Sequence, residues 1–208
     1  MNPILTIVTR HMPRKRKRVI TRMLESIDFM KDNAQKQIII DDKEIGHPYA
    51  ASLVVKAKGE VTGDYVWLLD DDDECSCPQM IFLLQRIKKH VNPDLIMARC
   101  LLNHDNVMPE DKVWNLKNIQ VIQPKQIPMP AMIMKNELYQ KTIDAIQGHD
   151  SRLDWYLMER LQQVDKESPL VIYWLDVIVM RQQTKLSQRS ESSRIDVSDV
   201  ILFGRIVN

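Results

Sequence analysis

Short apolar runs alternate with helical patterns through the first half of the chain. Three short apolar runs predict buried strands, at 4–8, 37–40 and 65–69, and the first of them is rich in β-branched residues. Apolar residues spaced three or four positions apart predict amphipathic helices, at about 19–30, 49–57 and 80–91. Ser76 is expected to cap the third helix and Pro78 to lie in its first turn. Because strands and helices alternate, this half is typical of an α/β fold with parallel strands.

The second half of the sequence is less regular. Apolar runs predict further strands, at 94–102, 118–122, 130–134 and 170–180. Helical spacing predicts two more helices, at 135–146 and 154–163. We find no internal repeat and no linker. We therefore expect one α/β domain with a mostly parallel central sheet.

Composition is that of a soluble globular protein, with 208 residues, 44% apolar and 27% charged. The 29 Lys and Arg nearly balance the 28 Asp and Glu, so bulk charge does not indicate nucleic acid as a partner. Three cysteines favour reduced thiols in the cytosol over disulfides. No apolar run reaches the roughly 20 residues of a membrane span, and no signal peptide is evident. We expect a cytoplasmic protein.

Polar side chains follow three of the predicted strands. They are Thr9-Arg10-His11, Asp41-Asp42, and the run Asp70 to Asp73 that continues into Glu74. If the strands are parallel, these segments meet at the carboxyl edge of the sheet, where open α/β folds bind ligands. Adjacent carboxylates repel one another, and oxygen ligands of this kind suit Mg²⁺ or Mn²⁺. The alternative is a solvated acidic loop that binds nothing.

A run of five basic residues, Arg14 to Arg18, follows the first strand. It is typical of a solvated loop and helix start. Two functional alternatives are binding to nucleic acid or anionic lipid, and electrostatic steering of an anionic substrate.

The segments "ILTIVTR", "MLESI", "IIIDD" and "GDYVWLLDDDDE" resemble the family 2 type glycosyltransferases of GT-A fold. The resemblance covers roughly residues 3–90 in order and spacing, and it resumes at 148–161 with "GHDSRLDWYLMERL". It implies one GT-A domain with a nucleotide-binding half at 1–92 and an acceptor and catalytic-base half at 93–186. Residues 187–208 would form a polar C-terminal tail.

The same resemblance implies a function, which is Mn²⁺- or Mg²⁺-dependent transfer of a sugar, with inversion, from a nucleotide-diphosphate sugar. The donor would be a UDP-sugar and the acceptor a hydroxyl group of a saccharide or glycan. Its implied site residues are Thr9 and Asp41 for the base, Arg10, Lys56 and Asp71 as further nucleotide-sugar contacts, Asp70 for ribose and metal, Asp72 for metal, and Asp154 as catalytic base.

Several alternatives remain open from the sequence. The metal pair could instead be Asp71 and Asp73, and Asp150 is a rival base. No histidine follows His149, so Gln182 or Gln183 could lie near the metal instead of a late histidine. A rival function is a non-catalytic nucleotide- or nucleic-acid-binding module on the same fold. A nucleotidyltransferase is disfavoured because no glycine-rich loop follows the first strand.

Overall fold

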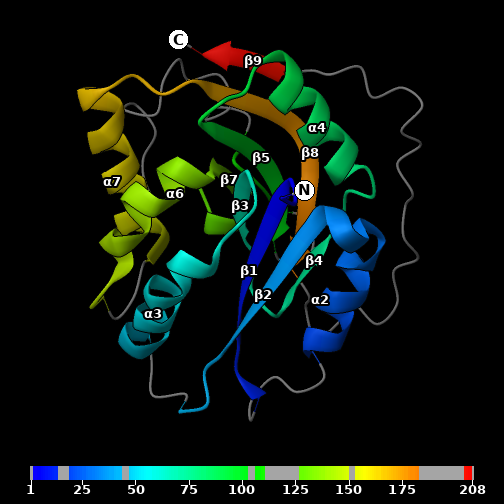
Figure 1. The fold of residues 1–208 in the computed structure, drawn as a ribbon, viewed down its shortest axis with the longest axis vertical. Helices are drawn as coiled ribbons and strands as arrows, with labels where there is room; N and C mark the ends of the chain where they lie inside the picture. Colours follow the sequence, from blue (N-terminus) through cyan, green and yellow to red (C-terminus); the bar gives the residue numbers. More distant parts are fainter. Residues whose placement is uncertain are drawn as a thin grey trace.

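A curved β-sheet with helices on both faces organises the protein (Figure 1). The computed structural model describes residues 2–13, 19–43, 47–102, 106–110, 127–149, 153–182 and 204–207. The strands are β1 (Leu5–His11), β2 (Ala34–Ile40), β3 (Tyr65–Leu68), β4 (Asp73–Cys75), β5 (Leu95–Leu102), β6 (Asn106–Met108), β7 (Met132–Lys135), β8 (Ile172–Gln182) and β9 (Gly204–Val207). The α-helices are α2 (Val19–Ile27), α3 (His47–Lys56), α4 (Met80–His90), α6 (Asn136–Thr142) and α7 (Leu153–Glu167).

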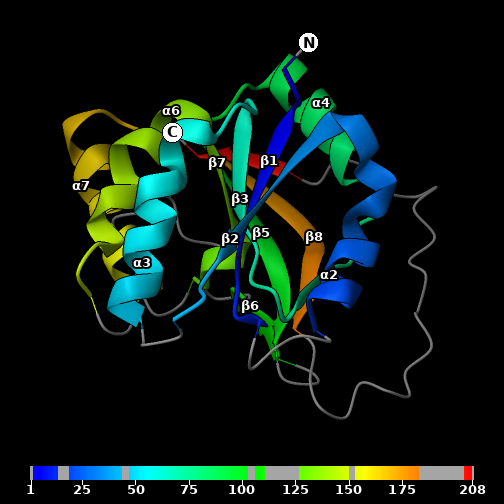
Figure 2. The same cartoon turned by 60° about the horizontal axis from the view of Figure 1, so that its bottom comes forward.

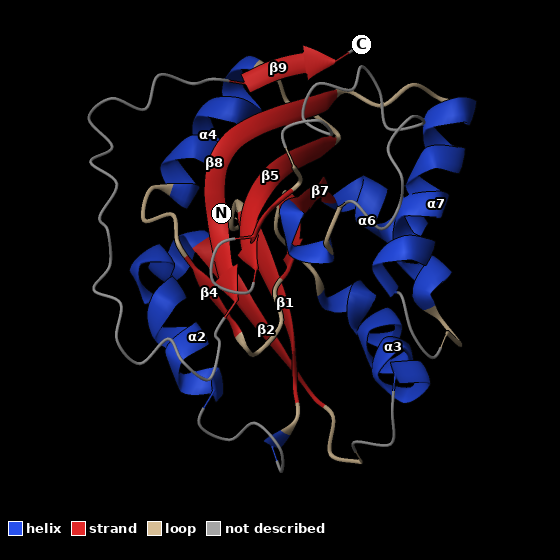
Figure 3. Ribbon diagram, turned by 180° about the vertical axis from the view of Figure 1, so that it is seen from behind, coloured by secondary structure: helices blue, strands red, loops and turns tan. Residues whose placement is uncertain are grey.

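The helices form two layers. Helices α2 and α4 lie on one side of the sheet, and α3, α6 and α7 lie on the other (Figure 3). Short 3₁₀ segments extend several of the helices or precede a strand, at Asp28–Asn33, Ala57–Glu60, Met129–Ala131 and Ile143–Ile146. No helix in the described ranges is long and apolar enough to cross a lipid bilayer.

The sheet runs in the order β2-β1-β3-β7-β5-β8-β4, with β6 paired to β5 and β9 paired to β8. Strand β1 is parallel to β2 and β3, and β5 is parallel to β8. Strand β7 is antiparallel to both β3 and β5, so β2, β1, β3, β5 and β8 all run in one direction. The predicted α/β fold with a mostly parallel central sheet is confirmed.

The core lies on both faces of the central strands. All four residues of β3 are buried, and the exposed fraction of Trp67 is 0%. A continuous apolar strand of this kind is expected where helices cover both faces of a sheet. The Trp67 Nε1–H group donates a 2.8 Å hydrogen bond to the Pro130 carbonyl, which satisfies its polar atom inside the core.

Helix α4 has close to its predicted extent but not its predicted N-terminal cap. Its first residue is Met80, preceded by Gln79 with no side-chain cap, so the predicted capping role of Ser76 is wrong. Residues Asp73–Cys75 instead form β4, antiparallel to β8, and the Ser76 N–H donates to the Val179 carbonyl at 2.9 Å. Pairing with the sheet therefore holds this segment extended up to the residue that was expected to start the helix.

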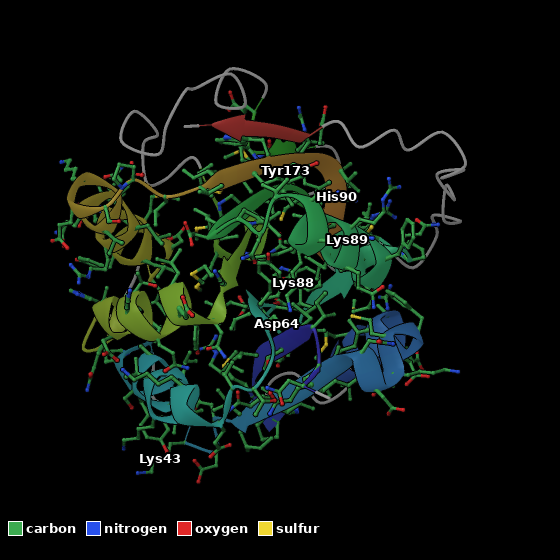
Figure 4. The ribbon with its side chains drawn as sticks, turned by 45° about the horizontal axis from the view of Figure 1, so that its top comes forward. Lys43, Asp64, Lys88, Lys89, His90 and Tyr173 are labelled. Carbon is green, nitrogen blue, oxygen red and sulfur yellow. The ribbon has the colours of Figure 1, made fainter. Side chains whose placement is uncertain are left out.

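The last turn of α4 is basic, which suits the negative end of a helix dipole. Lys88 Nζ lies 2.6 Å from Asp64 Oδ2 and joins the helix to the turn before β3, while Lys89 and His90 are exposed beside it (Figure 4). This basic surface lies at the amino end of β3, away from the acidic run that follows that strand.

The other predicted elements occur where expected, with boundaries shifted by a few residues. The strand predicted at 118–122 and the basic run Arg14 to Arg18 lie outside the described residues. Strands β4, β6 and β9 were not predicted. Strand β9 lies in the segment expected to form a polar tail, and it pairs with the first residues of β8.

Candidate functional site

The carboxyl ends of the parallel strands meet at one edge of the sheet. In the cross-strand register His11 lies beside Ile40, and Val8 beside Leu68. The Asp41 N–H donates to the His11 carbonyl at 2.9 Å, so the end of β2 is fastened to the end of β1. Figure 2 shows β1 and β2 running toward this edge. The predicted convergence of the polar strand ends is confirmed.

The four aspartates after β3 form a tight turn, which we call the acidic turn (Asp70–Asp73). The Asp73 N–H donates to the Asp70 carbonyl at 3.1 Å and closes the turn. One carboxylate oxygen from each of Asp70, Asp72 and Asp73 lies within 4.8 Å of the other two. Three convergent oxygen donors fit a divalent cation such as Mg²⁺ or Mn²⁺, which prefers oxygen ligands.

Asp71 differs from the other members of the acidic turn. It is 1% exposed, and its Oδ2 lies 2.8 Å from His11 Nδ1. The same oxygen accepts a hydrogen bond from the Met12 N–H at 3.2 Å. This carboxylate faces the end of β1, whereas the three others converge. The three convergent carboxylates include Asp70 and Asp72, the pair that the resemblance assigns to the metal, together with Asp73 of the alternative pair. Which of them bind a metal stays a prediction.

A cleft of about 450 Å³ opens beside the acidic turn. Its polar lining comes from five side chains on four segments, which are Arg10 of β1, Asp70 and Asp73 of the acidic turn, Asp154 of α7 and Gln182 of β8. Its apolar walls include Ala50, Ala51 and Val54 of α3, Leu102 at the end of β5, and the Pro128–Pro130 segment. A concave, mainly apolar cavity with a few convergent polar groups is the usual form of a small-molecule site.

Asp154 is the second residue of α7 and lies in the wall of this cleft. Its Oδ1 accepts a 2.9 Å hydrogen bond from the Trp155 N–H. Burial raises the pKa of the Asp154 carboxyl above the ordinary value for aspartate, while the N–H groups of Trp155 and Asp154 oppose that shift. A carboxylate with a raised pKa is a stronger proton acceptor than an exposed one.

Of the predicted site residues, Arg10, Asp70 and Asp154 line the cleft together, and their functional roles stay predictions. Thr9 and Asp41 lie at the same sheet edge, but each is 1% exposed and neither lines the cleft. Their roles, like that of Asp71, stay predictions.

Lys56 is exposed as the last residue of α3, beyond the residues of that helix that line the cleft. Its assigned contact with the nucleotide-sugar also stays a prediction. Asp150 and Gln183 lie outside the described residues.

One part of the cleft was not found from the sequence, and a second was named only as an alternative. The adjacent residues Ala50 and Ala51 leave room for a ligand against α3. The only hint of this in the sequence is two small side chains side by side in a predicted helix. Gln182, at the end of β8, lies opposite Asp73 in the β4–β8 register and lines the same cleft. The sequence named Gln182 only as an alternative, because nothing local to residue 182 indicates its pairing with residue 73.

No protein-family model matches this chain, and no curated protein matches its sequence. Solved structures do resemble it. S. aureus TarS 1–349, solved in complex with UDP-GlcNAc, matches with a TM-score of 0.65 at 11% sequence identity, over 92% of this chain and 60% of that chain.

Glucosyl-3-phosphoglycerate synthase from Mycobacterium tuberculosis, solved with Mn²⁺, UDP-glucose and phosphoglyceric acid, matches with a TM-score of 0.55 at 13% identity. That match covers 88% of this chain and 73% of the synthase. Both neighbours have the GT-A fold, so the GT-A fold expected from the sequence motifs is confirmed. The chain spans about 60% of the length of TarS 1–349.

Proposed function

We propose that this protein is a metal-dependent glycosyltransferase that moves a sugar, with inversion, from a nucleotide-diphosphate sugar to an acceptor hydroxyl. The observation that carries the proposal is the cleft itself. It places Arg10, two carboxylates of the acidic turn and Asp154 around one cavity of about 450 Å³ at the carboxyl edge of a GT-A sheet. Such a cavity is large enough for a small-molecule ligand.

The donor in this proposal is a UDP-sugar, and the acceptor is a saccharide or glycan. The UDP-GlcNAc and UDP-glucose bound by the two structural neighbours support that donor class. Arg10 is the basic side chain that lines the described cleft, and its guanidinium group suits the paired oxygens of a diphosphate.

The oxygen donors of Asp70, Asp72 and Asp73 would hold the cation, with Gln182 beside them. A bound Mn²⁺ or Mg²⁺ would neutralise negative charge on the departing diphosphate. The Mn²⁺ in the mycobacterial synthase supports a divalent metal.

Asp154 is the proposed general base. Its carboxylate would take the proton of the acceptor hydroxyl while that oxygen forms a bond to the anomeric carbon. The bond between this carbon and the diphosphate oxygen breaks, and the nucleoside diphosphate leaves with the electron pair. A single displacement of this kind inverts the anomeric configuration. A correctly placed carboxylate contributes about 10²- to 10⁴-fold to rate.

Calorimetry with UDP-, GDP- and dTDP-sugars, with and without Mn²⁺, tests the binding part of the proposal. We expect Mn²⁺ to strengthen binding of one donor class and Asp72→Ala to remove that effect. Asp28→Asn is the matched control, because Asp28 is a surface carboxylate paired with Lys36 at 3.3 Å. Absence of metal-dependent binding to any of these nucleotides would contradict the enzyme proposal.

Transfer assays with Asp154→Asn and Asp150→Asn test the catalytic part. We expect Asp154→Asn to reduce turnover by about 10²- to 10⁴-fold with nucleotide affinity nearly unchanged. Loss of turnover in Asp150→Asn alone would assign the base to Asp150. Tight nucleotide binding without turnover on any acceptor would favour a non-catalytic binding module. The anomeric configuration of the product, read by NMR, tests inversion.

A further inference from the structure

We propose that His11 is a positioning residue for the metal site, and that it acts through Asp71 to set the shape of the acidic turn. This inference rests on the proposed metal-dependent function and extends it to a side chain that does not line the cleft. It predicts that the loss of one buried hydrogen bond at the end of β1 weakens Mn²⁺ binding by the neighbouring aspartates.

The contact between His11 and Asp71 is short and buried. His11 is 7% exposed and Asp71 is 1% exposed, so water competes little for their hydrogen bond. His11 Nδ1 lies 2.8 Å from Asp71 Oδ2. An ionised carboxylate can only accept hydrogen bonds, so this contact is a hydrogen bond in the tautomer that carries the proton on Nδ1. The Met12 N–H is a second donor to the same oxygen, at 3.2 Å.

His11 also joins three segments of the predicted site. It is the last residue of β1, it lies beside Ile40 in the register with β2, and its carbonyl accepts the Asp41 N–H at 2.9 Å. Its side chain reaches the turn after β3, 60 residues away in sequence. One residue thus fixes the acidic turn relative to the ends of both β1 and β2.

Anchoring Asp71 bears directly on the metal ligands, because it lies between Asp70 and Asp72. Three convergent carboxylates within 4.8 Å of one another repel, and that repulsion favours a wider turn. Fixing the carboxylate of Asp71 toward β1 restricts the backbone dihedrals available to its neighbours. The anchor therefore preorganises the three oxygens for a cation, as hydrogen bonds behind metal ligands generally do.

The test compares His11→Asn with His11→Leu. The Asn side-chain amide can donate from about the position of Nδ1, whereas Leu fills similar space and cannot donate. Mn²⁺ binding is measured on each purified full-length variant by electron paramagnetic resonance of free Mn²⁺, with Mn²⁺ alone and with Mn²⁺ plus UDP. We expect His11→Leu to weaken Mn²⁺ binding by about 10- to 100-fold and His11→Asn to lose less than about tenfold.

Thr142→Val is the control for simple loss of stability. Thr142 is fully buried, and its hydroxyl donates to the Leu138 carbonyl at 2.8 Å, away from the cleft lining. This variant also loses one buried hydrogen bond, and we expect it to keep the Mn²⁺ affinity of the wild type. Circular dichroism and thermal denaturation establish that the variants are folded at the assay temperature.

Asp71→Asn keeps the proposal testable if His11→Leu does not fold. The Asn oxygen can still accept from His11 and Met12, so we expect Mn²⁺ affinity to fall less than about tenfold, unlike that of Asp72→Asn. Wild-type affinity in His11→Leu, or equal losses in His11→Asn and His11→Leu, would overturn the inference. Equal losses in Asp71→Asn and Asp72→Asn would also overturn it. Absence of Mn²⁺ binding by the wild type with UDP would instead contradict the proposed function.

Discussion

Replacing Asp72 with asparagine removes one charge from the three carboxylates that converge on the acidic turn. Each of these oxygens lies within 4.8 Å of the other two. Two unit charges at 4.8 Å repel by about 0.9 kcal/mol at the dielectric constant of water and by about 3.5 kcal/mol at an effective value near 20. Because Asp70 and Asp72 are partly exposed, the lower figure is the appropriate one. Asp72 takes part in two such pairs, so Asp72→Asn should remove about 1–2 kcal/mol of repulsion from the metal-free acidic turn.

The sign of the effect should reverse when the metal is added. A ligand at 100 times its dissociation constant stabilises the folded state by about 2.7 kcal/mol, and the wild type should gain this from Mn²⁺ while Asp72→Asn gains much less. Thermal denaturation in EDTA and in excess Mn²⁺ measures both effects, at about 2–4 °C per kcal/mol for a chain of this length. The variant should melt above the wild type in EDTA and below it in Mn²⁺.

The control is Asp28→Asn, which removes a surface ion pair whose carboxylate is 82% exposed. Such a pair contributes about 0–1 kcal/mol, and its loss should not change the response to Mn²⁺. The reasoning is refuted if Asp72→Asn lowers stability in EDTA and keeps the full Mn²⁺ increment of the wild type. That result would mean that protein contacts stabilise the Asp72 carboxylate and that it is not a ligand of the cation.

Two further predictions concern Gly63 and Asp154. A Cβ atom at Gly63 would lie 2.5 Å from the Thr6 backbone nitrogen and 2.6 Å from the Leu5 carbonyl carbon, so Gly63→Ala should cost about 1–3 kcal/mol in urea denaturation. Gly59→Ala, where nothing lies within 4 Å of the added atom, is the control, and equal stability of the two variants would contradict the close packing. Burial raises the pKa of Asp154 in the folded protein above the ordinary aspartate value near 4. Ionising this carboxyl therefore costs the folded protein more than the unfolded chain, and the folded protein loses stability as pH rises above about 4. Asp154→Asn should therefore unfold at higher temperature than the wild type at pH 7 but not at pH 3, and an equal change at both pH values would show that the Asp154 carboxylate is not disfavoured by burial.

Local sequence patterns determined most of the fold. Side-chain direction repeats every two residues in a strand and every 3.6 residues in a helix, so the spacing of apolar residues indicates which side chains are buried. The spacing of Leu83, Leu84 and Ile87 marks the buried face of a helix in this way, and the unbroken apolar run Tyr65–Leu68 marks a strand buried on both faces. The acidic turn also follows from sequence, since a strand covered on both faces must end where its polar residues begin. The motifs quoted above then led to the GT-A fold, which the structural neighbours confirm.

The tertiary structure decided which side chains share the site. Four consecutive aspartates look alike in sequence, and only contact with His11, 60 residues earlier, separates Asp71 from the other three. The pairing of β4 with β8 keeps the chain extended up to Ser76, which therefore does not cap α4, and it places Gln182 opposite Asp73. These outcomes depend on hydrogen bonds between segments far apart in the chain, and a local pattern of apolar and polar residues does not record such contacts.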